Sequence, residues 1–315
     1  MEDCCIWGVL KCRSVSIQQF FIFGIDKVII LHTAERMCMS VSACLITWNE
    51  EEMLPYCLKF LNSLDAVDEI CVIDSYSTDR TWDILQTFRQ QTNKGLVLGR
   101  RQFNTFSRQR NECMDMAGGD WMLSIDADET FTQDLGGLLK ALPDIPSVNA
   151  IRIPTLYMIH DRKHYIEPVN TDPHIRIWRR RFARFYRDVH EVLRDDCDRD
   201  LHCCCDADVL TVGTTSAPYD VWMKHYQYLK SDSNLILKGL RWDKLGLIEE
   251  SAKNGIPVYP MFWHATKYKA TQSQSILELP RQWYDITTDD PFPLTTNEES
   301  HVTPGITSTL GSKCL

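Results

Sequence analysis

The stretch that decides the fold is residues 119–129, GDWMLSIDADE. Residues 121–125 are almost wholly apolar and predict a buried strand, which ends at two carboxylates, Asp126 and Asp128. In an α/β sheet, ligands bind outside the carboxyl ends of the strands. Because two carboxylates this close repel each other, we expect a positive partner between them. A hard divalent cation that carries a phosphate substrate is the expected partner.

Strand and helix patterns alternate around this stretch. Short runs of apolar and β-branched residues predict strands, and apolar residues at helical spacing predict helices between them. The predicted strands are 41–47, 69–74, 96–98 and 121–125, and the predicted helices are 51–64, 81–91, 107–117 and 132–142. This alternation predicts an α/β fold with a doubly wound, mostly parallel, Rossmann-like sheet.

Composition and sequence pattern divide the chain into four parts. Residues 1–38 carry no motif, and we expect them to be extraneous or poorly ordered. Residues 39–215 form the main domain, whose later segments 150–156 and 174–178 alternate in polarity, as antiparallel additions do. Residues 216–285 are predicted to be a helical C-terminal segment packed on it. Residues 286–315 are rich in Thr, Pro, Asn, Asp and Glu, which is typical of disorder.

Composition limits the partners and the compartment. A formal net charge of −9 argues against nucleic acid, whose phosphates select basic surfaces. The basic run at 179–181 is either a solvated strand edge or a surface for pyrophosphate or an anionic, membrane-borne acceptor. Scattered cysteines without a secretory signal indicate reduced thiols and a cytoplasmic protein. The apolar run at 20–31 is too interrupted to span a bilayer, so the expected membrane contact is at most peripheral.

Four motifs occur in order along the chain: LITWNEE at 45–51, VIDSYSTDRT at 72–81, QRN at 109–111 and GDWMLSIDADE at 119–129. Together they resemble family 2 glycosyltransferases of the GT-A fold, most of all the soluble subgroup that includes lipopolysaccharide-core glucosyltransferases. RIWR at 176–179 and VHE at 189–191 extend the resemblance, which covers about residues 41–193. Each motif alone is weak, but four in order at family spacing are specific.

The resemblance implies a metal-dependent, inverting glycosyltransferase with a nucleotide-sugar donor, expected to be UDP-linked, and a glycan or lipid-linked acceptor. It places Asp128 on a Mg²⁺ or Mn²⁺ ion that stabilises the departing diphosphate, and Asp126 on the ribose or the ion. From the residues alone, Asp128 or Thr130 could instead cap the next helix. An EF-hand is excluded because Phe131 stands where its loop requires glycine.

Polar residues at two other strand ends are expected to complete the nucleotide pocket. Asp74 ends the second strand, where its carboxylate can accept hydrogen bonds from a base or ribose. The alternative for Asp74 is a turn residue that binds local backbone N–H groups. Thr47, Asn49 and Glu50 end the first strand and are expected to line the same pocket.

The sequence allows two roles each for Arg110 and His190. Arg110 lies on a predicted helix and either meets the donor phosphates or pairs on the surface with Asp115 or Glu112. His190 is either a further metal ligand, since imidazole is used by Mn²⁺, or a partly buried histidine bonded to the backbone.

Inverting transfer also needs a base that takes the proton of the attacking hydroxyl. The resemblance offers Asp172, in an acidic-then-arginine segment, and Glu191, in the His-Glu pair. Family members usually show a Pro-Asp pair here, whereas this chain reads Thr171-Asp172-Pro173, which leaves the alignment of Asp172 open.

Two other functions compete with the glycosyltransferase reading. A nucleotidyltransferase on a similar sheet would need a glycine-rich phosphate loop after the first strand, and residues 48–51 contain no glycine. A catalytically inactive carbohydrate-binding relative is the non-enzyme alternative. Retention of both Asp126 and Asp128 speaks against it.

Overall fold

The computed structural model describes residues 39–167, 170–202, 207–213, 219–253 and 275–281, with the single positions 255, 258, 263, 266 and 267. For residues 170–172 and 275 the description covers the backbone alone. The predicted N-terminal extension and C-terminal tail lie outside the described residues, as does part of the predicted C-terminal segment.

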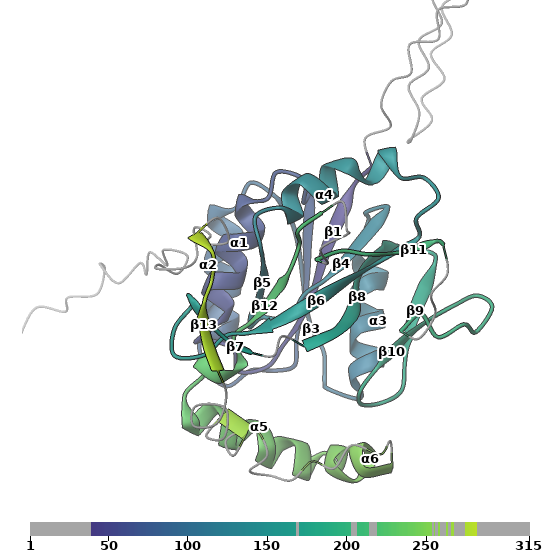
Figure 1. The fold of residues 1–315 in the computed structure, drawn as a ribbon. Coiled ribbons are helices and arrows are strands. Elements are labelled where there is room, and N and C mark those ends of the chain that lie inside the picture. Colours follow the sequence, from purple (N-terminus) through teal and green to yellow (C-terminus); the bar gives the residue numbers. More distant parts are fainter. Residues whose placement is uncertain are drawn as a thin grey trace, which may run out of the picture.

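Strands and helices alternate through the first half of the chain, and strands dominate the second (Figure 1). The strands are β1 (Val41–Thr47), β2 (Glu69–Asp74), β3 (Gly95–Arg100), β4 (Trp121–Ser124), β5 (Glu129–Phe131), β6 (Ala150–Tyr157), β7 (His164–Glu167), β8 (Asn170–Arg179), β9 (Ala183–Tyr186), β10 (Val192–Asp195), β11 (Val209–Thr211), β12 (Met223–His225) and β13 (Ser275–Glu278). The helices are α1 (Leu54–Ser63), α2 (Thr81–Gln91), α3 (Phe106–Met116), α4 (Leu135–Ala141), α5 (Asp232–Lys244) and α6 (Leu247–Lys253), with short 3₁₀ turns at η1 (Leu142–Asp144) and η2 (Gln227–Leu229).

One large sheet organises the molecule, in the order β3-β2-β1-β4-β8-β6-β12-β5, with β11 beside β6. Strands β3, β2, β1 and β4 run parallel to one another. Strand β8 is antiparallel to both β4 and β6, while β12 is parallel to β6. The predicted α/β class, the mostly parallel sheet and the antiparallel additions are therefore confirmed.

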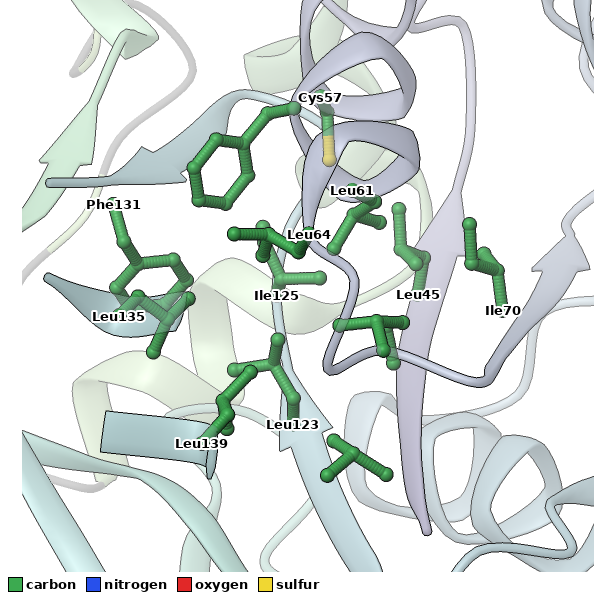
Figure 2. Close-up of a cluster of buried hydrophobic side chains, with 14 of the residues drawn as sticks. Leu45, Cys57, Leu61, Leu64, Ile70, Leu123, Ile125, Phe131, Leu135 and Leu139 are labelled. Carbon is green, nitrogen blue, oxygen red and sulfur yellow. The ribbon is translucent and has the colours of Figure 1, made fainter. Parts of the chain in front are cut away.

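Helices cover both faces of the sheet, as a doubly wound fold requires. Side chains of β1 alternate, so that Ala43 and Leu45 join one core while Cys44 joins the other. The first core lies under α1, α2 and α4, and Figure 2 shows Leu61 of α1 close to Leu45 and Ile125. The second core lies under α3 and the β9–β10 hairpin. Because β1 and β4 pair in parallel, their carboxyl ends lie at the same edge of the sheet.

The structure corrects the sequence prediction at three short strands. Residues 129–131, directly after the acidic pair, form β5, so the next helix begins at Leu135 rather than at 132. Within the C-terminal segment that was predicted to be helical, residues 223–225 form β12, which inserts between β6 and β5, and residues 275–278 form β13, which pairs with β7. Strands of three residues are too short to show a period of two, and their pairing is set by distant neighbours. The helical prediction holds for α5 and α6, which lie below the sheet in Figure 1.

Helix ends follow local chemistry. Pro55 stands in the first turn of α1, where its missing N–H costs no hydrogen bond. Thr105 caps α3, since its hydroxyl accepts from the backbone N–H of Arg108 at 3.2 Å. Ser231 caps α5 by accepting from the backbone N–H of Asn234 at 3.3 Å. In the part of the chain that the structure describes, each helix is too short or too polar to cross a membrane.

Gly119 provides a test of the close approach between β1 and β4. A Cβ atom there would lie 2.5 Å from Ser42 Oγ and 2.8 Å from Ser42 N. Backbone cannot move away cheaply, so we expect Gly119→Ala to lower the free energy of unfolding by about 1–3 kcal/mol. Urea denaturation measures this change.

Gly137→Ala is the matched control, because nothing lies within 4 Å of a Cβ at that exposed position of α4. We expect it to raise the free energy of unfolding by about 0.4–1 kcal/mol, since alanine restricts the unfolded chain. Equal stabilities of the two variants would contradict the close approach.

Candidate functional site

A cavity of about 250 Å³ opens at the carboxyl ends of β1 and β4. Its walls come from the ends of these strands, from α3, from the segment before β10, and from α5. The lining polar residues are Thr47, Glu50, Ser75, Gln109, Arg110, Asp126, Asp128, His190, Glu191, His225, Lys230, Asn234, Lys238 and Arg241. This edge is where the fold class places its ligands.

Asp128 lies at the centre of a buried charge cluster. Its Oδ2 is 2.8 Å from Lys230 Nζ and 3.6 Å from His225 Nε2. Burial alone would raise the pKa of Asp128, but Lys230 and His225 outweigh it and hold this pKa well below its usual value. Asp128 is therefore an anion in the folded protein, and its helix-capping alternative has no support, because Asp134 precedes α4.

Glu50 shares the same ammonium group. Lys230 Nζ donates to Glu50 Oε1 at 2.7 Å, and the two carboxylates raise the pKa of Lys230 against the opposing effect of burial. Burial raises the pKa of Glu50 to about 7, although Lys230 acts in the opposite direction. The second oxygen of Glu50, Oε2, is buried and has no hydrogen-bond partner among the described residues.

Arg110 connects the acidic pair to the His-Glu segment. Its Nη1 lies 2.8 Å from Asp126 Oδ1, its Nη2 lies 3.1 Å from Asp126 Oδ2, and its Nε donates to Glu191 Oε1. Burial would raise the pKa of Asp126, but Arg110 and then Arg176 lower it overall. The arginine thus faces the cavity and not the surface.

The surface alternative for Arg110 is wrong, because both of its expected partners are bound by other arginines. Asp115 pairs with Arg184 at 2.6 Å, and Glu112 pairs with Arg108 at 3.1 Å.

The third acidic residue of the opening motif supports the first. Glu129 is buried, and its Oε2 accepts from the backbone N–H of Asp126 at 2.9 Å. Its other oxygen accepts from Arg176 Nη2 at 2.7 Å. The guanidinium of Arg176 therefore balances the charge of Glu129, whose other oxygen orients the backbone at Asp126. Arg176, in the RIWR segment, thus has a structural role.

Of the residues at the end of β1 that were predicted to line the nucleotide pocket, some face the cavity and one makes its contacts within the protein. Thr47 lines the cavity, whereas the side chain of Asn49 binds the next loop through Thr78 N at 2.8 Å. Asn49 has a positive φ of 52°, a conformation that asparagine tolerates better than most residues. Its role here is to shape the loop.

Asp74 is fully buried and has its hydrogen bonds within the protein. Its Oδ2 accepts from the backbone N–H of Ser77 at 3.1 Å and from Arg100 Nε at 3.1 Å. Its Oδ1 accepts from the hydroxyls of Ser77 and Thr47. These contacts match the turn alternative for Asp74, and direct contact with a nucleotide stays a prediction.

His190 turns toward α6. Its Nε2 lies 2.8 Å from Ser251 Oγ, its ring stacks edge-on against Trp242, and burial is the main cause that lowers its pKa. The hydrogen-bond partner is thus a side-chain hydroxyl instead of the backbone. Metal ligation by His190 stays a prediction, as does the role of Asp172, whose side chain lies outside the described residues.

The polar residues that close the cavity from the C-terminal side were not expected from the sequence. Lys230, Asn234, Lys238 and Arg241 all line it from α5 and its N-terminal flank. Asn234, Lys238 and Arg241 stand at i, i+4 and i+7, which places them on one face of α5, while Lys230 precedes the helix. That spacing was readable in the sequence, but the sequence did not show that this face meets the acidic pair. His225 was missed for the same reason.

A divalent cation fits this site if the donor supplies part of its coordination. Within the described residues, no group of three or more His, Cys, Asp or Glu side chains has metal-binding geometry. Mg²⁺ is commonly held by one or two carboxylates together with substrate phosphates. Asp128, Asp126 and His225 offer such donors, and Glu50 Oε2 is an unsatisfied acceptor nearby. Lys230 and the cation would compete for Asp128.

The fold and the site define an α/β protein with a charged cavity at the carboxyl edge of a parallel sheet. The chain belongs to glycosyl transferase family 2, whose family model matches residues 42–204. The predicted family is therefore confirmed, while the lipopolysaccharide-core subgroup stays a prediction.

Several relatives share parts of this chain. An uncharacterized glycosyltransferase of Rickettsia typhi is 27% identical over 161 residues, which cover 49% of this chain and 51% of that protein. Abequosyltransferase RfbV of Salmonella typhimurium is 24% identical over 213 residues, covering 66% and 55%. A TPR repeat-containing protein of Synechococcus elongatus is 36% identical over 114 residues, covering 36% and 26%.

The chain thus spans only about a quarter to a half of the length of these relatives. Among solved structures, a mannosyltransferase of Pyrobaculum calidifontis in complex with GDP-Man and Mn²⁺ is similar, with a TM-score of 0.43 and 17% identity over 72% of this chain and 69% of that one.

Arg110→Met tests the charge bridge. It leaves Asp126 and Glu191 without their guanidinium, so we expect the free energy of unfolding at pH 7 to fall by about 3–5 kcal/mol. Because the folded pKa of Asp126 is lowered, its contribution is present above the unfolded pKa and disappears as the pH falls through the folded value. The difference between the variant and the wild type should therefore shrink on acidification toward pH 3.

Arg108→Met, which removes only the exposed pair with Glu112, is the control and should change stability little at either pH. A pH-independent deficit in Arg110→Met would show that packing and not charge is lost.

Proposed function

We propose that this protein is a metal-dependent, inverting glycosyltransferase that moves a sugar from a UDP-linked donor to a hydroxyl of a glycan or lipid-linked acceptor. Membership of glycosyl transferase family 2 supports the reaction class. The observation that carries the proposal is the cavity at the carboxyl edge, which is lined by the carboxylates Asp126 and Asp128 and by the cations Lys238 and Arg241 of α5. A nucleoside diphosphate needs both kinds of group, since its phosphates bind cations and its ribose binds acceptors.

The proposed reaction is a direct displacement at the anomeric carbon of the donor sugar. A bond forms from the acceptor oxygen to that carbon, the bond from the carbon to the phosphate oxygen breaks, and the nucleoside diphosphate leaves. A carboxylate takes the proton of the acceptor hydroxyl, which contributes about 10²–10⁴-fold to the rate. Glu191 lines the cavity and supports this role, and Asp172 is the second candidate.

The leaving diphosphate carries the charge that the site must stabilise. A bound Mg²⁺ or Mn²⁺ would act as a Lewis acid on its oxygens. Asp128 would hold the cation together with Asp126 or His225. Arg110 keeps Asp126 ionised and in place, so the site is preorganised before the donor arrives.

Asp128→Asn tests the role of the acidic pair. We expect wild-type protein to be stabilised by UDP with Mn²⁺ in a thermal-shift measurement, and Asp128→Asn to lose most of this stabilisation, because an amide binds a divalent cation weakly. Asp83→Asn, an exposed position in the first turn of α2, is the control and should behave as the wild type.

A screen of nucleotide sugars for hydrolysis with and without Mn²⁺ identifies the donor. Binding without turnover of any donor would favour the inactive carbohydrate-binding alternative. The absence of both binding and turnover would overturn the proposal.

Glu191→Gln and Asp172→Asn distinguish the two candidate bases. The variant that lacks the base should lose about 10²–10⁴-fold in kcat while it keeps its affinity for UDP, because the proton is transferred only during the reaction. If Glu191→Gln weakens UDP binding as well, its main role is to hold Arg110. If neither variant loses activity, another group removes the proton.

A further inference from the structure

One face of α5 brings positive charge to the donor cavity. Lys238 and Arg241 line it from this face, Lys230 lines it from the segment just before the helix, and Asp126 and Asp128 line it from the sheet edge. A nucleoside diphosphate in the cavity would therefore lie between carboxylates on the sheet side and cations on the helix side.

The start of α5 is fixed to the loop that follows β1. Ser231 binds Glu52 through its backbone N–H at 2.9 Å and through its hydroxyl at 2.5 Å. Asn234 Nδ2 donates to the backbone carbonyl of Asn49 at 3.5 Å. With the Lys230–Glu50 pair, these bonds set the position of the helix relative to the sheet edge. The cations of α5 are thus placed before any ligand binds.

Of the three cations, Lys230 is paired with carboxylates and Arg241 stacks against aromatic rings. Lys230 lies between Glu50 and Asp128. The Arg241 guanidinium lies 3.8 Å from the centre of the Trp48 ring, and burial lowers its pKa to about 10.

Lys238 lacks the carboxylate partners of Lys230, and its ring contact is longer than that of Arg241 with Trp48. Its ammonium lies 4.9 Å from the centre of the Trp263 ring and forms no ion pair with the described residues. Burial and then Lys230 lower its pKa, so its charge is poorly compensated. An anion in the cavity would supply the missing partner, and a phosphate offers several oxygens to an ammonium.

We propose that Lys238 binds the diphosphate of the donor from the helix side of the cavity. This inference rests on the proposed function and assigns a donor-binding residue outside the segment that matches the family. Lys238 contacts non-bridging phosphate oxygens, with the Trp263 ring behind its ammonium. Its charge belongs to the protein, so it contributes to binding whether or not a divalent cation is bound.

Isothermal titration of the whole chain with UDP and with uridine tests this role. We expect Lys238→Met to weaken UDP binding at least 10-fold, both with Mn²⁺ and with a chelator, and to leave uridine binding unchanged. Lys238→Arg should recover most of the affinity because it restores the charge. Lys244→Met, an exposed position in the last turn of the same helix, is the matched control and should bind UDP as the wild type does.

The outcomes separate this inference from the proposed function. If wild-type protein binds UDP and Lys238→Met binds it equally well, the inference is wrong and the proposed function stands. If Lys238→Met loses uridine and UDP binding alike, its effect is structural, and the inference is again wrong. If wild-type protein binds neither UDP nor GDP, both are overturned. Thermal melting of each variant shows whether the fold is kept.

Discussion

Charge compensation at the carboxyl edge of the sheet is the constraint on which the structure depends. Four carboxylates gather there, from Glu50, Asp126, Asp128 and Glu129. Carboxylates taken out of water cost several kcal/mol each unless they are paired. Their counter-ions come from three separate elements: Arg110 from α3, Arg176 from β8 and Lys230 from the flank of α5. The edge is therefore stable only when all three elements are in place.

The loop after β1 connects the acidic edge of the sheet to the loop after β2 and to the start of α5. Asn49 and Glu50 of this loop were expected to face a nucleotide, and Asn49 instead connects parts of the protein, as do two residues with no predicted role, Glu51 and Glu52. Asn49 binds the loop after β2, Glu51 accepts from the backbone N–H of Arg80 at 3.0 Å, and Glu52 binds the start of α5. The loop positions the cavity, while Thr47, Trp48 and Glu50 line it.

Much of the fold could be predicted from the sequence because its signals are local. Helical spacing and buried runs located β1, β2, α2 and α3 closely, and the apolar run before Asp126 located β4. Strands β5 and β12 could not be predicted, since three residues carry no period and their pairing depends on neighbours far along the chain.

The candidate site shows the same difference between residues with a local sequence signal and residues whose contacts depend on distant parts of the chain. Asp126, Asp128 and Arg110 were found because they lie in motifs, and the structure brings them to one cavity. Lys230, Lys238 and His225 were missed because an isolated lysine or histidine gives no sign of which carboxylate it will meet. Asp74 was predicted to contact a nucleotide because it ends a strand, but its hydrogen bonds are made within the protein.

The pair formed by Glu50 and Lys230 joins residues that are 180 positions apart in the sequence. Contacts of such long range form late, because the entropy of closing the intervening chain must be overcome first. During synthesis, the parallel strands β1 to β4 emerge long before the lysine that neutralises their acidic edge. Until that lysine is in place, Glu50 and Asp128 lack the cation that they share, and the segment that supplies it also completes the wall of the cavity.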